Sequence, residues 1–324
     1  MTAAPNQAPL ERFLNIFTEV RPGEATSALL LALNIFLILT AYYVLKPVRE
    51  ALILAGGGAE IKSYAAAGQA LLLLAAVPLY GWIASRVPRR VLINGVTLFF
   101  AGCLLVFYGL AHLLVPLGVV FFLWVGIFNL MVPAQFWALA NDLYTPEAGK
   151  RLFVIVAFGA SCGAVAGSYL DSLLIGSVGV YQLMLVAAGI LAVSLVLTNG
   201  VERRERARKA QIDLSAGAQQ TGEDEPLKEG GAFALVFRSR YLLLIALLML
   251  VLNWVNTTGE YILGRTVLAA AEEAVASGTA RGLSEEEYIG EFYAEFFTVV
   301  NLVGLLLQLF VVSRVLKYLS LIHI

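Results

Sequence analysis

Long uninterrupted apolar blocks constrain the fold of this chain more than any other feature. Eight such blocks occur, most of them more than 20 residues long. An α-helix of about 20 apolar residues crosses roughly 30 Å of hydrocarbon. Transmembrane β-strands would instead give alternating segments of about 10 residues, which the sequence lacks. We therefore predict an all-α integral membrane protein, with helices at roughly 25–54, 62–84, 91–112, 116–144, 151–173, 178–198, 240–265 and 290–315.

The composition supports this class and argues against several functions. The chain is 60% hydrophobic and 14% charged, whereas a soluble domain is nearer one half apolar and one quarter charged. A net charge of −1 gives no electrostatic basis for binding nucleic acid. The only cysteines and histidines are Cys103, Cys162, His112 and His323, which are too scattered for a metal site or a catalytic triad. We expect no enzyme activity, no metal and no cofactor.

Basic residues predict the orientation in the membrane. Lys and Arg concentrate in every second connection, including 85–90 and the start of 201–239. The intervening connections lack basic residues, except that 266–289 carries Arg281 among several glutamates. Cytoplasmic loops are enriched in Lys and Arg, so we predict a multi-pass protein of the cell (inner) membrane with a cytoplasmic N-terminus.

The order of the helices suggests four regions. Residues 1–24 form an N-terminal cytoplasmic segment, and 25–200 form a first bundle of six helices. A charged cytoplasmic linker, 201–239, separates that bundle from the start of a second one, 240–324. This is the layout of a secondary transporter built from two halves. We expect twelve helices in all, and therefore interpret the chain as truncated after eight.

Two apolar helices carry charges close to their outer ends. In YYVLKPVREALIL, the i, i+3, i+4 spacing places Lys46, Arg49 and Glu50 on one helix face. Glu260 and Arg265 occupy a comparable place in the seventh predicted helix. Such charges either snorkel to the interface or line a water-filled path through the membrane. The pattern leaves both possibilities open.

Other segments suggest capping, packing or gating. Asn141 and Asp142 precede a helix start at Thr145-Pro146-Glu147. Glycines at 159, 163 and 167 suggest close helix packing. GGGAEIKS at 56–63 lacks the glycine that precedes the lysine of a phosphate-binding loop. YGWIASRVPRR, residues 80–90, resembles a major facilitator loop associated with gating, and the matching residues are Gly81, Arg86, Arg89 and Arg90.

Three blocks together resemble the ATP/ADP translocase family of nucleotide transporters: TAYYVLKPVREALILAGGGAEI, FWALANDLYTPEAGKRLFVIVAFGA and VNTTGEYILGR with EEYIGEFYAEFF. The resemblance implies a twelve-helix bundle similar to the major facilitator superfamily and the exchange of ATP for ADP. It also implies substrate-binding roles for Lys46, Arg49, Glu50, Asp142 and Glu260.

An anionic cargo requires cations along its route, and Arg265 is a further candidate. The expected partners are thus a nucleotide or other small anion and the lipid bilayer. The first alternative is a major facilitator carrier of another organic anion or a sugar phosphate. The second is a membrane sensor or partner protein that does not transport.

Overall fold

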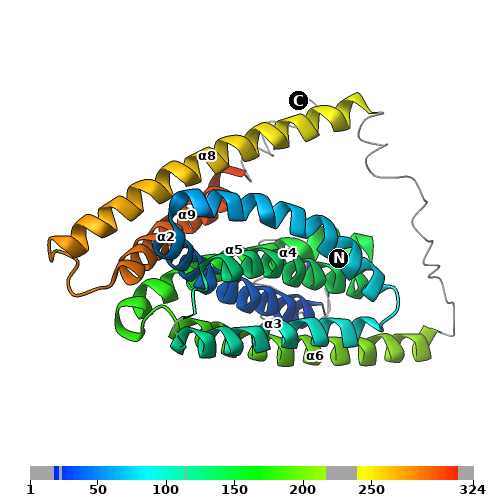
Figure 1. The fold of residues 1–324 in the computed structure, drawn as a ribbon. Coiled ribbons are helices and arrows are strands. Elements are labelled where there is room, and N and C mark those ends of the chain that lie inside the picture. The colour runs from blue at the N-terminus through cyan, green and yellow to red at the C-terminus, as the bar shows by residue number, and fades with distance from the viewer. Residues whose placement is uncertain (1–17, 22–23, 114, 217–238, 313–324) are drawn as a thin grey trace.

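The computed structural model describes residues 18–21, 24–113, 115–216 and 239–312, and within these ranges every regular element is a helix (Figure 1). Seven helices are long and apolar enough to cross a membrane, which confirms the predicted fold class. They are α2 (Ala25–Ala84), α3 (Arg89–His112), α4 (Gly118–Leu143), α5 (Pro146–Val178), α6 (Gln182–Ala216), α8 (Arg240–Ala276) and α9 (Glu285–Leu307), which continues into a short π-helix, η1 (Gln308–Val312).

Helix α2 contains the first two predicted spans. Its 60 residues would extend about 90 Å if the helix were straight, far more than one membrane crossing requires. The helix is broken at Gly58, which has φ 74° and ψ 178°, a conformation open to glycine but not to other residues. Figure 1 shows the second half of α2 running back in the opposite direction. The seven helices therefore accommodate the eight predicted spans.

Helix α6 continues into the predicted linker. The sixth span was predicted to end at 198 and the linker to begin at 201, but α6 extends to Ala216. The helix continues because its next residues, ERRERARKAQ at 202–211, are all strong helix formers. The remainder of the linker, 217–238, lies outside the described residues, as do most of the segment 1–24 and residues 313–324.

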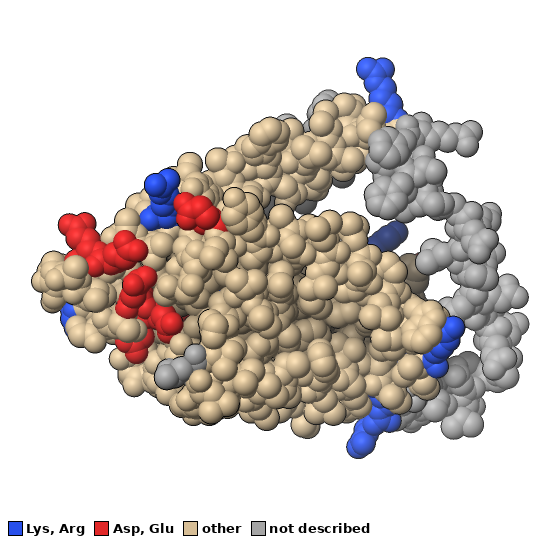
Figure 2. All heavy atoms as spheres, viewed as in Figure 1, with Lys and Arg blue, Asp and Glu red and all other residues tan. Residues whose placement is uncertain are grey.

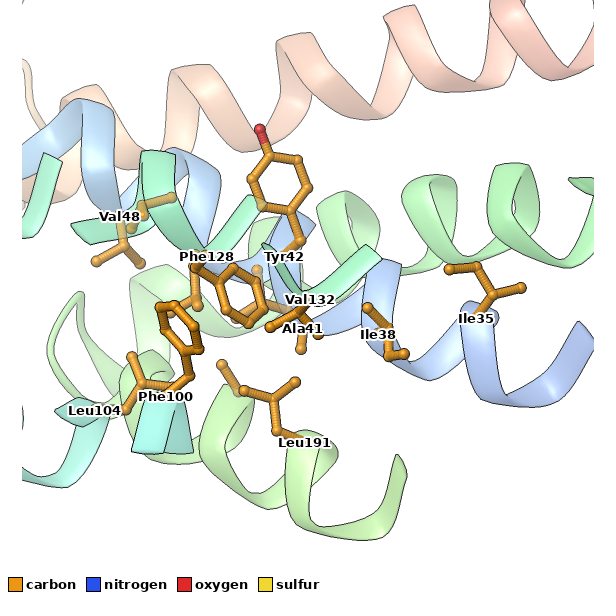
Figure 3. Packing of buried hydrophobic residues seen from close by; sticks show 14 of the residues in the cluster. Ile35, Ile38, Ala41, Tyr42, Val48, Phe100, Leu104, Phe128, Val132 and Leu191 are labelled. Atoms are coloured by element: carbon orange, nitrogen blue, oxygen red, sulfur yellow. The ribbon is translucent and has the colours of Figure 1, made fainter. Parts of the chain in front are cut away.

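The first half of α2 forms the centre of the bundle, and α4, α5, α6 and α9 pack around it. An aromatic cluster fills the space beside it. The Phe128 ring lies 5.4 Å from the Phe100 ring and 5.7 Å from the Trp124 ring, measured between centroids. Figure 3 shows Phe100 and Phe128 beside Ala41 and Val132. The cluster joins α3 to α4 beside the central helix.

Three glycines of α5 allow it to approach α2 closely. This glycine stripe consists of Gly159, Gly163 and Gly167. A Cβ atom added at these positions would collide in turn with the backbone carbonyls of Ala32, Phe36 and Thr40. The packing role predicted for these residues is confirmed, because only glycine leaves room for the facing backbone.

The two ends of the bundle differ in charge. Figure 2 shows acidic side chains gathered at the end where α8 connects to α9, and several basic side chains at the opposite end. This is the asymmetry on which the predicted orientation depends. At the acidic end, Tyr181 donates a hydrogen bond of 2.9 Å to Glu286 of α9. Burial, followed by the neighbouring Glu286 carboxylate, raises the pKa of Tyr181 to about 12, so the phenol remains a donor at neutral pH.

Candidate functional site

Glu50 is the central charge of the candidate site. Its side chain is buried, with 1% of the residue exposed, in the middle of the bundle. It accepts hydrogen bonds from the Arg49 guanidinium, and one carboxylate oxygen lies 2.6 Å from Lys62 Nζ. One carboxylate is thus held between two cations, which is the arrangement a buried charge requires.

The break at Gly58 brings Lys62 to Glu50. The two residues are 12 positions apart, which would separate them by about 18 Å along a straight helix. The reversal of α2 closes this gap. Lys62 is therefore a site residue that the sequence analysis missed. The available signal was the run Gly56-Gly57-Gly58, which allows a reversal four residues before the lysine.

A cavity of about 420 Å³ opens beside these charges. Helices α2, α8 and α9 supply its walls, which combine ionisable, amide and aromatic side chains. The main ones are Tyr43, Lys46, Glu50, Lys62, Glu260 and Phe297. Binding sites for small molecules commonly have volumes of about 300–1,000 Å³, so the cavity can admit a solute.

Lys46 faces this cavity from the same helix as Glu50. Its Nζ lies 3.8 Å from the centre of the Phe297 ring and 5.3 Å from that of Tyr43. An aromatic face attracts a cation weakly compared with a carboxylate. Lys46 therefore remains able to bind an anion that enters.

Glu260 joins α8 to the cluster. Its carboxylate lies 3.8 Å from Lys62 Nζ and accepts a hydrogen bond of 3.1 Å from Asn256. Its side chain is 50% exposed, in contrast to that of Glu50 at 2%. The grouping contains three cations, Lys46, Arg49 and Lys62, and two anions, so one positive charge is in excess. Such a site favours an anionic ligand.

Two predicted substrate-binding residues lie outside this cavity. Arg265 is exposed on α8 and is not among the residues that line it. Asp142 is near the far end of α4, whose first residue, Gly118, packs against Leu52. The 24 positions from Gly118 to Asp142 correspond to about 36 Å along a helix. The structure brings Lys46, Glu50 and Glu260 together with Arg49, but does not bring Asp142 or Arg265 to them.

Asp142 instead belongs to a cluster at the start of α3. Its carboxylate lies 2.6 Å from Arg89, and Arg90 lies 3.7 Å from Glu202 of α6. Arg86 stacks over the Trp82 ring at 3.9 Å. Gly81, the residue directly before Trp82, is exposed. Of the four residues of the predicted gating loop, Arg89 ties α3 to α4 and Arg90 ties α3 to α6.

We expect Arg89→Gln to leave stability nearly unchanged. Both side chains of the Arg89–Asp142 pair are 47% exposed, and exposed pairs typically contribute about 0.2–1 kcal/mol. The melting temperature of the purified variant in detergent should stay close to that of the wild type. A large loss of stability would show that Arg89 supports the fold, and would argue against a role confined to gating.

The described part of the chain has seven helices long and apolar enough to cross a membrane, and three of them, α2, α8 and α9, wall a charged, solute-sized cavity. These are the features of a polytopic membrane protein of the transporter type. The model of the Major Facilitator Superfamily matches residues 27–316. The chain belongs to this superfamily, and the protein is a secondary membrane transporter. No curated protein and no solved structure matches the sequence. The superfamily match specifies no substrate, so exchange of ATP for ADP stays a hypothesis.

Proposed function

We propose that the protein exchanges organic anions across the cell membrane by alternating access, with ATP and ADP as the first substrates to test. The observation that carries this proposal is the cavity in which Lys46, Lys62 and Glu50 converge, together with the buried ion pair between Arg49 and Glu50. Intramembrane charges are costly and usually mark a substrate path.

The lining of the cavity supports a nucleotide more specifically. Lysine side chains bind phosphate as point charges, and Lys46 and Lys62 both reach the cavity. Aromatic rings stack on nucleobases without regard to sequence, and Tyr43, Tyr293 and Phe297 line the same space. Phosphate and base could therefore bind to neighbouring walls.

The carboxylates give this site a way to exchange its ligand. Lys62 is paired with Glu50 and approached by Glu260. An entering phosphate would compete with Glu260, the more exposed of the two, for Lys62. Departure of the anion would restore these internal pairs, so Lys62 keeps a carboxylate partner throughout the exchange.

The proposed orientation has the N-terminus and the Arg89–Asp142 cluster at the cytoplasmic side. The charge difference between the two ends in Figure 2 supports it. In this orientation Arg89 and Arg90 form the centre of a cytoplasmic gate, because their ion pairs tie α3 to α4 and α6. Gly81 and Arg86 would complete that gate from the end of α2 and the turn that follows it.

Exchange in proteoliposomes tests the proposal. Vesicles containing the protein and loaded with ADP should take up labelled ATP, and excess unlabelled ATP should suppress the uptake. If ATP is not taken up but a sugar phosphate or another organic anion is, the alternative carrier is correct. If no anion in such a panel is exchanged, anion transport by this chain is refuted.

A further inference from the structure

Asp171 is the most isolated charge-bearing group in the described part of the chain. It lies on α5 and is 0% exposed. Neither of its carboxylate oxygens has a hydrogen-bond partner among the described residues. Burial of an ionised carboxylate without a partner is so unfavourable that such a group becomes neutral instead.

The neighbours of Asp171 place it where three helices meet. One turn before it, Gly167 packs against Thr40 of α2. One turn after it, Ile175 packs against Gly290 of α9. Residues three and four apart share one face of a helix, so Asp171 lies on the face of α5 that contacts both α2 and α9.

This position is adjacent to the candidate site. Asn301 of α9 lines the cavity and donates a hydrogen bond of 3.0 Å to Ser168. Ser168 is three residues before Asp171 on the same face of α5. A movement of α9 relative to α5 would break this hydrogen bond and open the surroundings of Asp171 to the cavity.

The ionisable groups on the packed helices do not pair with Asp171. Lys46 is held over the Phe297 ring, and Arg49 is paired with Glu50. Helix α6 has no ionisable side chain between residues 182 and 201. The other ionisable side chains on the nearby stretches of α2 and α9 are Tyr42, Tyr43, Glu291, Tyr293 and Glu295, and none of them is hydrogen-bonded to Asp171.

We propose that Asp171 is a proton-binding site that couples substrate movement to the movement of a proton. While water still reaches it, the carboxylate takes one proton from hydronium and leaves water, and α9 then closes against α5. When α9 moves away and water enters, the carboxylic acid returns that proton to water. No electron is transferred. The coupling function rests on the proposed anion transport, whereas the proton site itself does not.

An imposed pH gradient tests the coupling. In proteoliposomes with the membrane potential clamped, labelled ATP should accumulate in the wild type about tenfold for each unit of pH gradient if one proton moves with each substrate. Asp171→Asn should abolish this accumulation but retain exchange without a gradient. Glu147→Gln, an exposed acid on the same helix, should behave as the wild type. Full gradient-driven accumulation by Asp171→Asn would overturn the proposal.

Infrared spectroscopy tests the proton site without any substrate. Purified protein in lipid bilayers at neutral pH should show the C=O stretch of a protonated carboxylic acid, which Asp171→Asn should remove and Glu147→Gln should retain. Identical spectra for the wild type and Asp171→Asn would overturn the proton site even if ATP is exchanged. Loss of the band in Asp171→Asn would support it even if ATP is not a substrate, so the two proposals can fail separately.

Discussion

Glu50→Gln should abolish transport and lower the free energy of unfolding by about 3–5 kcal/mol, the range found when one partner of a buried ion pair is removed. Glu50 is the shared anion of Arg49 and Lys62. Glutamine has nearly the same shape but no charge. Arg49 would remain in the interior without a carboxylate partner, and Lys62 would keep only Glu260, at 3.8 Å.

Two comparisons make this prediction specific. Glu60→Gln, an exposed glutamate of the same helix, should change neither property, since its amide oxygen can still accept the hydrogen bond from Tyr261. The double variant Glu50→Gln/Lys62→Gln should regain much of the lost stability but no transport. Thermal unfolding in detergent and uptake by proteoliposomes measure the two effects. A Glu50→Gln protein as stable as the wild type would refute the ion-pair cluster.

Gly163→Ala and Gly176→Ala should have opposite effects on stability, although both lie on α5. A Cβ atom at Gly163 would collide with the Phe36 carbonyl of α2, whereas one at Gly176 meets no atom within 4 Å. Overpacking costs typically about 1–3 kcal/mol. Alanine in an open helical position gains up to about 1 kcal/mol over glycine.

Melting temperatures in the same detergent measure both glycine variants. We expect a decrease for Gly163→Ala and a small increase for Gly176→Ala. Equal shifts of the same sign would mean that helix propensity, and not contact with α2, determines the effect. The close approach of α5 to α2 would then contribute little to stability.

The sequence predicted the helices well because each consists of an apolar block of sufficient length. It also predicted the glycine stripe, whose spacing of four is a local property. The reversal of α2 was harder to interpret. The sequence indicated two separate spans, and only the conformation of Gly58 shows that one broken helix carries both.

The candidate site was less predictable because it depends on how distant segments meet. Lys46, Glu50 and Glu260 line one cavity, which corresponds to the second of the two possibilities that the pattern of charges left open. Lys62 was missed because its partner is reached only through the reversal at Gly58. The pairing of Asp142 with Arg89 depends on the relative placement of α3 and α4, which periodicity does not give.

The most direct measurement is the affinity of the purified protein for ATP, determined by calorimetry for the wild type, Lys46→Gln and Lys150→Gln. A hydrogen bond to a charged group contributes about 1.5–3 kcal/mol, so loss of the cavity-lining Lys46 should weaken binding about tenfold or more. Lys150, an exposed cation on α5, should be dispensable. Equal affinity in all three proteins would contradict the claim that the cavity beside Glu50 binds the anion.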